Sequence, residues 1–308
     1  MKICITGGAG FIASNIAEHY LKLGHEVVII DNLALGFRKN IPDGAKFYHL
    51  DINDSEIHNI FQKEKFDIVN HHAALMSVRY SVYNPIDDAR TNILGSINLL
   101  EAAKNSGVKK FIFSSSAGTV YGEQNVFPCD ETHPNKPISP YGVSKLSTEK
   151  YIEYYNTLYG MDFVIFRYTN VYGRRQNPHG EAGVVAIFAL KMLNNEPAYI
   201  TGDGSITRDY VYIDDIVKAN ELALNDNVHG IFNIATGIET DLNAIFDKLA
   251  KFTNYKLPRE YMESKPGEQK RSVCTAEKFH KLTGWQPQTM LDEGLPKTVE
   301  FYRTYDIE

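Results

Sequence analysis

Residues 6–13, with the sequence TGGAGFIA, decide how this chain folds. The apolar run Ile3–Ile5 leads into them and an apolar-periodic segment beginning at Phe11 leads out, which predicts a strand, a tight glycine turn and a helix. In that arrangement Gly7 permits the turn and Gly10 lets the backbone approach a pyrophosphate. The N-terminus of the following helix adds free N–H groups and the positive end of the helix dipole. The stretch therefore predicts a dinucleotide-binding turn.

A glycine-rich turn alone is weak evidence for dinucleotide binding, but the next strand supports this prediction. An apolar strand over residues 26–30 ends in Asp31, at about the spacing expected for the acid that binds the adenosine ribose. The Asp31 carboxylate repels a 2′-phosphate, and no cation follows it in the sequence until Arg38. The sequence therefore predicts NAD, in preference to NADP, as the cofactor.

The composition argues against several classes of function. The 308 residues suffice for one large or two modest domains, and a net charge of −6 without a dense basic run argues against nucleic acid as a partner. Cys4, Cys129 and Cys274 lack metal-site spacing, and two adjacent histidines at 71 and 72 do not suit one ion, so we expect no metal. No stretch is apolar enough to span a membrane, and a strand at the very start leaves no room for a signal peptide. With the odd, scattered cysteines, these features predict a cytoplasmic protein.

Strand and helix patterns alternate through the first half of the chain, which predicts an α/β fold with a doubly wound parallel (Rossmann) sheet. We expect one long helix over residues 86–105 and a late buried strand at 231–234 that rejoins the sheet. The expected domains are a NAD-binding domain over 1–170, rejoined by about 205–240, and a smaller mixed α/β C-terminal substrate domain over 171–204 and 241–308. Ligands bind at the carboxyl ends of the strands in such sheets.

Tyr141 and Lys145 are the residues best placed for chemistry. They lie four apart and share a face of a helix that Ser139-Pro140 starts, as N-cap and first helical residue. A second Tyr-x-x-x-Lys pair, Tyr261–Lys265, is bracketed by prolines and does not suit a helix. We expect Tyr141 to be a general base whose pKa Lys145 lowers, and a hydroxyl among Ser114–Ser116 to hydrogen-bond the reacting oxygen.

These motifs together resemble the extended short-chain dehydrogenase/reductase family, and within it the NAD-dependent nucleotide-sugar epimerases. The resemblance runs nearly end to end. It rests on TGGAGFIA, DNL at residues 31–33, DI at 51–52, HHAA at 71–74, FIFSSSAGTVYG at 111–122, SPYGVSK at 139–145, RYTNVYG at 167–173, GEAGVVAIF at 180–188, GDGSITRDYVYIDD at 202–215 and FNIATG at 232–237.

The resemblance implies a role for each matching residue. It makes Ser116, Tyr141 and Lys145 catalytic; counting back from Tyr121-Gly122 would select Ala117 instead of Ser116, so we assume a bulge after Ser116. The implied NAD-binding residues are Gly7, Gly10, Phe11, Ile12, Asp31, Asn32, Asp51, Ile52, His72, Ala73, Ala74, Asn92, Ser114, Tyr141, Lys145 and Tyr168. The implied substrate-binding residues are Ser116, Asn170, Val184, Val185, Thr201, Arg208, Lys265, Arg271 and Ser272.

Three substrate positions depart from the common pattern or bear on specificity. Thr201 stands where relatives often place a phenylalanine beside the uracil, and Lys265 where they often place a phosphate-binding arginine, for which Arg271 is a substitute. Ser272 matches a gate at the 2-position of the sugar, where a small residue admits N-acetylated sugars.

The activity implied by the resemblance is inversion of C4 of a UDP-hexose, UDP-glucose or UDP-galactose, through a 4-keto sugar, in a homodimer. A related epimerase acting on UDP-GlcNAc/GalNAc or a UDP-uronate is an alternative. A dehydratase or decarboxylase is disfavoured, since such relatives carry an acid two or three residues after the catalytic serine and here Gly118 and Thr119 stand there. A catalytically inactive NAD-sensing regulator is a third alternative, although such proteins usually lose the Tyr/Lys pair.

Overall fold

The structure is a computed structural model that describes residues 1–179, 183–263 and 269–304. The chain divides into two compact units. The first unit comprises residues 1–122, 134–167 and 217–232, and the second comprises 123–133, 168–216 and 233–308. The expected domains differ from these units chiefly at 123–133 and 205–216, which were expected in the NAD-binding domain.

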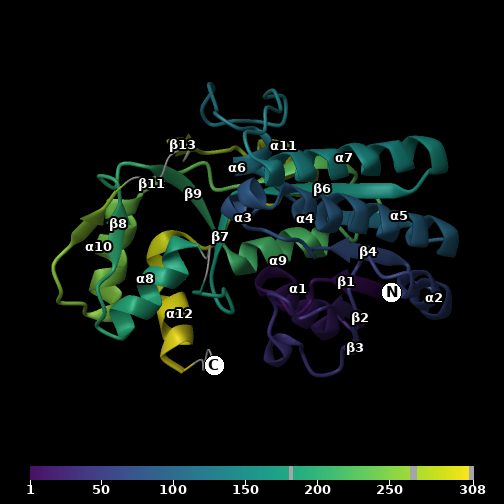
Figure 1. Cartoon of the computed structure of the whole chain (residues 1–308), viewed down its shortest axis with the longest axis horizontal. Coiled ribbons are helices and arrows are strands. Elements are labelled where there is room, and N and C mark those ends of the chain that lie inside the picture. Colours follow the sequence, from purple (N-terminus) through teal and green to yellow (C-terminus); the bar gives the residue numbers. More distant parts are fainter. Residues whose placement is uncertain (180–182, 264–268, 305–308) are drawn as a thin grey trace. The chain divides into compact units, whose positions relative to one another are not determined.

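A seven-stranded sheet forms the centre of the first unit (Figure 1). Its order is β10-β6-β5-β4-β1-β2-β3, and the pairs from β5 to β3 are parallel. The strands are β1 (Lys2–Thr6), β2 (Glu26–Asp31), β3 (Lys46–His49), β4 (Ile68–His71), β5 (Lys110–Ser116), β6 (Asp162–Tyr168) and β10 (Gly230–Ile234). The predicted parallel sheet is confirmed, including the late strand that rejoins it.

Helices cover both faces of this sheet. On one face α1 (Phe11–Lys22) lies beside α9 (Ile213–Leu222), and the two helices are joined by a hydrogen bond from Tyr20 Oη to the carbonyl of Asn220 at 2.8 Å. On the other, α2 (Glu56–Glu64), α5 (Gly95–Ser106) and α7 (Pro140–Tyr159) pack side by side (Figure 1). Their apolar residues and the strands form one buried core around Phe61, Leu99 and Ile152. The fold thus leaves the carboxyl ends of β1, β2, β4 and β5 at one edge.

The single helix expected over residues 86–105 is wrong in detail. The segment consists of α4 (Pro85–Ala89), a π-helical turn η2 (Arg90–Leu94) and α5, and a separate short helix, α3 (Val78–Tyr83), precedes it. In the π turn the carbonyl of Asn92 accepts hydrogen bonds from Ser96 Oγ at 2.6 Å and Thr148 Oγ1 at 2.9 Å. Side-chain hydroxyls thus satisfy this carbonyl, and the 3.6-residue periodicity of the sequence does not reveal them.

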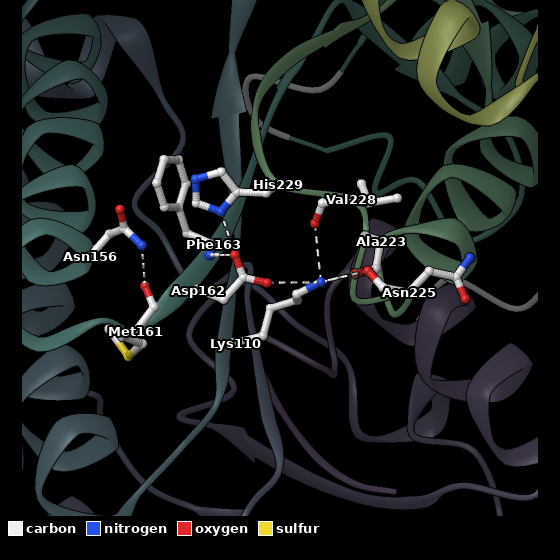
Figure 2. Close-up of polar contacts among 9 residues, drawn as sticks. All are labelled: Lys110, Asn156, Met161, Asp162, Phe163, Ala223, Asn225, Val228 and His229. Carbon is white, nitrogen blue, oxygen red and sulfur yellow. Dashed lines mark hydrogen bonds and ion pairs between the residues drawn. The ribbon is translucent and has the colours of Figure 1, made fainter.

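Lys110, at the start of β5, holds the returning segment 223–229 to the sheet (Figure 2). Its buried ammonium donates to the carbonyls of Ala223 at 3.3 Å, Asn225 at 2.6 Å and Val228 at 3.1 Å. The Asp162 carboxylate balances its charge at 3.1 Å and also contacts His229 Nδ1 (Figure 2). This cluster joins the starts of β5 and β6 to the chain that leads into β10.

Glu64, the last residue of α2, ties that helix to two strands. Its Oε2 lies 2.6 Å from Lys2 Nζ, and its Oε1 accepts from Lys46 Nζ and Tyr48 Oη, both at 2.5 Å. These bonds lower the pKa of Glu64 to about 2. Because the pKa in the folded state lies below its unfolded value, the stabilisation is present at neutral pH and is lost as pH falls from about 4.5 towards 2.

We expect Glu64→Gln to lower the free energy of unfolding by about 2 kcal/mol at pH 7, and by only about a quarter as much near pH 2.5, where the carboxyl is partly protonated. Urea denaturation at both pH values measures this. Glu26→Gln is the matched control, since Glu26 also faces Lys2, at 3.9 Å, but its side chain is 78% exposed. An equal loss from Glu64→Gln at both pH values would contradict the prediction.

The second unit is built around β9 (Thr207–Tyr212), which pairs with β7 (Asn170–Tyr172), β11 (Glu239–Asp241) and β13 (Arg271–Ser272). Its other strands, β8 (Tyr199–Thr201) and β12 (Glu260–Met262), form a separate two-stranded sheet. The helices α8 (Val184–Leu193), α10 (Leu242–Thr253) and α12 (Leu291–Thr304) pack against one another. Short elements elsewhere in the chain are η1 (Arg38–Asn40), α6 (Ala117–Val120) and α11 (Glu277–Thr283).

Cys129 explains why residues 123–133 belong to the second unit. It forms a parallel β-bridge with Cys274, and its N–H donates to the carbonyl of Val273 at 2.9 Å. All three cysteines are free thiols and buried. Within the part of the chain that is described, no helix has the length and apolar character needed to cross a membrane.

Candidate active site

The glycine turn after β1 has the geometry of a dinucleotide-binding turn. Gly7 has a φ of +71°, and a Cβ there would lie 2.7 Å from the backbone nitrogen of Ala73, so only glycine lets the turn lie against the segment after β4. Gly10 is the N-cap of α1 and caps it without a side chain. The first N–H groups of the helix therefore point to a site open to a phosphate.

Asp31 ends β2 beside this turn. Its Oδ2 accepts from the N–H of Ala9 at 3.0 Å and its Oδ1 from the N–H of Leu33 at 2.7 Å. Each carboxylate oxygen has a further lone pair for a ribose hydroxyl. Asn32 Nδ2 donates to Asp51 Oδ2 at 2.7 Å, which brings the predicted residues at the ends of β2 and β3 together. The residues present fit NAD.

The carboxylate of Asp31 also predicts discrimination between the two nicotinamide cofactors. We expect NAD to bind at least about tenfold more tightly than NADP, because a 2′-phosphate would meet Asp31 while Arg38 stacks over the Phe47 ring, 5.3 Å from its centroid. Calorimetry with both dinucleotides measures the ratio. Asp31→Asn should lower the ratio of NADP to NAD dissociation constants. Asp43→Asn, a change at an exposed position, should leave this ratio unchanged. Equal or tighter binding of NADP by the wild type would contradict the prediction.

The residues after β4 are held from within the first unit. Thr6 Oγ1 accepts from the N–H groups of His72 and Ala73, both at 3.3 Å. His71 is a satisfied core residue, since its Nδ1 lies 2.7 Å from Thr6 Oγ1 and its Nε2 lies 2.9 Å from Ser96 Oγ. Burial lowers the pKa of His72 to about 3 and that of His71 well below its usual range, so both are neutral at pH 7.

Other predicted cofactor residues lie at the same strand ends or near them. Ile52 is buried against Gly95, where a Cβ would lie 2.7 Å from its Cδ1. Asn92 bonds both backbone groups of Leu75 at 2.9 Å, and so fixes the segment that follows Ala73 and Ala74. Tyr168 is buried at the end of β6. Phe11 and Ile12 open α1.

Helix α7, which carries Tyr141 and Lys145, begins as the sequence predicts. Ser139 is its N-cap and accepts from the N–H of Gly142 at 3.2 Å, and Pro140 is its first residue. A Cβ at Gly142 would lie 2.5 Å from the carbonyl oxygen of Thr119, so a glycine next to Tyr141 lets α7 pack on the turn after β5. Lys145 Nζ lies 5.6 Å from the centroid of the Tyr141 ring and donates to the carbonyl of Ser114 at 2.8 Å. Tyr141, Lys145 and the end of β5 are thus brought together.

The electrostatics of this pair correct one expectation. Burial lowers the pKa of Lys145 to about 8 and, together with the negative charge of Asp88, raises that of Tyr141 above its ordinary value. The Lys145 ammonium is directed to the Ser114 carbonyl and lies 4.7 Å from the Phe113 ring centroid. The expectation that Lys145 lowers the pKa of Tyr141 is therefore not met by the protein's own residues, because burial and Asp88 raise it.

The expected bulge after Ser116 is absent. Ser116 ends β5 and is followed directly by the helical turn α6, which accommodates the extra residue. Alternation along β5 puts Ser114 and Ser116 on one face, while the Ser115 hydroxyl bonds Glu149 on the other at 2.5 Å. Ala117 is fully buried. Ser116 therefore shares a face of β5 with Ser114, opposite to Ser115.

The remaining predicted substrate residues belong to the second unit. β9 gathers three of them, since it carries Arg208 and pairs with Ser272, the register partner of Arg208, and with Asn170. Thr201 ends β8, and Val184 and Val185 begin α8, so they lie on other elements. Lys265 lies outside the described residues, as do residues 267–268, from which the position of the gate was counted.

Arg271, proposed as a phosphate ligand, already has partners. Its guanidinium forms a bidentate pair with Glu239, with both N–O distances at 2.8 Å, and lies 3.7 Å from the centroid of the Phe127 ring. Glu239 and Phe127 were not predicted from the sequence, because they come from β11 and from the 123–133 segment. Asp88, whose buried negative charge affects the pKa of both Tyr141 and Lys145, was not predicted either.

Comparison with known proteins places these features in a family. The model of the NAD dependent epimerase/dehydratase family matches residues 3–235. The chain belongs to this family. A UDP-glucose 4-epimerase from Mycolicibacterium smegmatis is 39% identical to it over 98% of this chain and 99% of the relative.

Two solved structures are similar to this chain in fold over nearly its whole length. The Thermotoga maritima UDP-glucose 4-epimerase with UDP-glucose is 46% identical with a TM-score of 0.97, covering 98% of this chain and 99% of that one. The Thermus thermophilus UDP-glucose 4-epimerase complex with NAD is 40% identical with a TM-score of 0.95, covering 99% of both. The predicted family, fold class and NAD cofactor are confirmed.

Proposed function

We propose that this protein is a NAD-dependent UDP-hexose 4-epimerase, an isomerase that interconverts UDP-glucose and UDP-galactose. The observation that carries the proposal is the arrangement of Tyr141 and Lys145 on α7 against the Ser114 carbonyl, in a unit whose glycine turn and Asp31 fit NAD. The similarity to proteins named UDP-glucose 4-epimerase supports the substrate class.

The chain's own residues supply the proton chemistry. Tyr141 takes the proton of the C4 hydroxyl and returns it after the 4-keto sugar has presented its opposite face. Bound NAD⁺ supplies the hydride acceptor at C4 and a positive charge that favours the tyrosinate. Lys145 stabilises that tyrosinate, and the Ser116 hydroxyl donates to the C4 oxygen. In the second unit, Arg208, Asn170 and Ser272 are the candidates for binding the nucleotide sugar, with Val184, Val185, Thr201, Lys265 and Arg271.

The competing functions make different demands on the site. A dehydratase or decarboxylase needs an acid after the catalytic serine, but Gly118 and Thr119 lie in the α6 turn instead. A NAD-sensing regulator does not need Tyr141 and Lys145 packed at the end of β5. A related epimerase for UDP-N-acetylhexosamines or UDP-uronates uses the same catalytic residues and differs only in the sugar pocket.

A panel assay tests the proposal. The protein is incubated with NAD and, separately, UDP-glucose, UDP-galactose, UDP-N-acetylglucosamine and UDP-glucuronate, and the epimer ratio is followed by NMR. Conversion of UDP-glucose and UDP-galactose to one common equilibrium ratio supports the proposed activity. Loss of water or CO₂ from a sugar would point to the dehydratase or decarboxylase, and inertness with all four alongside tight NAD binding would point to the regulator.

A second copy of the chain is the proposed partner. An exposed apolar stripe runs along α7 through Val143, Tyr151, Tyr154 and Leu158, each 40–56% exposed. Beside it, α4, η2 and the start of α7 line a groove of about 500 Å³ with Pro85, Ala89, Ile93, Ile138 and Val143. Two such helical faces related by a twofold axis would bury each other's stripe.

The cytoplasmic location stays a prediction that rests on the free cysteines.

Sedimentation velocity at micromolar concentration tests the homodimer. The wild type is expected to sediment as a dimer, and Tyr154→Glu combined with Leu158→Glu as a monomer. Lys150→Gln, an exposed change on the same helix, is the control and should remain dimeric. A monomeric wild type, or a dimer that survives the double substitution, would overturn this interface.

A further inference from the structure

Asp88 is a buried carboxylate that the proposed mechanism does not use. It lies on α4, is 1% exposed, and among the described residues has no cation within salt-bridge distance. Its Oδ2 accepts from Ser144 Oγ at 2.5 Å and its Oδ1 from Asn92 Nδ2 at 2.8 Å. The side chain of its neighbour Asp87, by contrast, is 47% exposed and pairs with Arg90 at 3.0 Å. A buried charge satisfied only by neutral donors carries a cost that a purely structural role does not explain.

Both partners of Asp88 lead to the catalytic machinery. Ser144 immediately precedes Lys145 on α7, so its bond to Asp88 holds the helix turn that carries Lys145. Asn92, in the π turn, holds the backbone of Leu75 with both its amide atoms, next to the predicted cofactor residues after β4. One carboxylate therefore connects the catalytic helix to the segment beside the cofactor.

The charge of Asp88 acts on the Tyr141–Lys145 pair. Burial raises the pKa of Tyr141, and the charge of Asp88 raises it further. Burial lowers the pKa of Lys145, and the charge of Asp88 opposes this effect because it favours the ammonium. The other ionisable groups around the pair are fixed in charge or neutral. Glu149 of α7 is neutralised by Arg167 of β6, whose Nη2 lies 2.6 Å from Oε2, and His71 and His72 of β4 are neutral at pH 7. Asp88 is thus the uncompensated negative charge among the described groups that act on the pair.

We propose that Asp88 is a positioning residue whose negative charge sets the pH range in which Tyr141 and Lys145 work, while its bond to Ser144 holds the helix that carries them. The inference rests on the proposed function for its kinetic consequence, but the ionisation of Tyr141 that it concerns is a property of the protein itself. Removing the charge stabilises the tyrosinate and destabilises the ammonium, so both groups titrate at lower pH.

Asp88→Asn tests this, because it keeps the shape of the side chain: its amide oxygen can still accept from Asn92 Nδ2, and its NH2 group can donate to Ser144 Oγ in place of the bond that Asp88 accepts. Both limbs of the pH profile of kcat/KM for UDP-galactose are expected to move to lower pH, by about one unit for a nearby buried charge. Asp88→Glu keeps the charge and Asp87→Asn is the matched neighbour, so both should leave the limbs in place. Ser144→Ala breaks the hydrogen bond but keeps the charge, and should lower the height of the profile without shifting it downward.

A readout independent of turnover separates this inference from the proposed function. The absorbance near 295 nm reports tyrosinate, and subtracting the titration of Tyr141→Phe from that of each variant isolates Tyr141 in the NAD-loaded protein. Tyr141 should ionise at lower pH in Asp88→Asn than in the wild type, even if no tested sugar is epimerised. Unmoved limbs together with an unmoved Tyr141 titration would overturn the proposal. If Asp88→Asn does not fold, Asp88→Ser removes the same charge and carries the same expectation.

Discussion

Replacing Tyr141 with phenylalanine is expected to lower kcat for epimerisation by about 10³-fold, a typical contribution of a positioned general base. Binding of NAD and of UDP-glucose should stay nearly unchanged, because the hydroxyl acts mainly in the transition state. The ring is buried at the start of α7, and the helix is capped by Ser139 and Pro140, so removing one oxygen leaves the packing in place.

The measurement combines the epimer ratio by NMR with calorimetric binding of both ligands. Tyr151→Phe is the matched control, since Tyr151 lies on the same helix but is 40% exposed, and it should keep full activity. A positioned general base contributes at least about 10²-fold to the rate. A Tyr141→Phe variant that retains more than about a twentieth of the wild-type kcat would therefore contradict the role of Tyr141 as the base.

The burial of Tyr141 and Lys145 opposes the role of Tyr141 as a base. Burial raises the pKa of Tyr141 and lowers that of Lys145 to about 8, so the protein's own groups favour the neutral tyrosine. A positive charge brought beside the ring shifts the balance towards the tyrosinate. We therefore expect Tyr141 to act as a base chiefly when NAD⁺ is bound.

The sheet and the cofactor turn were predictable because their signals are local. Strand-ending Asp31, the glycines at 7 and 10 and the Ser139-Pro140 helix start each have a backbone reason that the sequence displays. The π turn at Arg90–Leu94 was not predictable, because hydroxyls of Ser96 and Thr148 satisfy the carbonyl of Asn92 and Thr148 is distant in sequence.

Electrostatics and small strands were the least predictable features. The sequence gives no sign that Asp88 is buried while the side chain of Asp87 is 47% exposed, and the charge of Asp88 adds to the effect of burial in raising the pKa of Tyr141. Arg271 is paired with Glu239 across two short strands that lack a clear apolar period. Such features depend on contacts between distant segments, which residue spacing does not encode.

The proposed gate at Ser272 gives the second large expected effect. Ser272 is 2% exposed on β13 and is the register partner of Arg208 on β9, so a large side chain at position 272 would fill space beside a candidate nucleotide-sugar residue. We expect the wild type to epimerise UDP-N-acetylglucosamine as well as UDP-glucose, since serine leaves room for an acetamido group.

Ser272→Tyr should therefore lower kcat/KM for UDP-N-acetylglucosamine by at least about 10²-fold while UDP-glucose loses less than about tenfold, because a steric gate acts only on the larger substrate. Ser272→Ala keeps the room and should preserve both activities, which separates size from loss of the hydroxyl. Comparing kcat/KM for both sugars in all three proteins decides the matter. Activity with UDP-glucose reports that Ser272→Tyr is folded, since the change is made at a buried position. A wild type inert towards the N-acetylated sugar, or an equal loss of both activities in Ser272→Tyr, would show that another side chain closes the pocket.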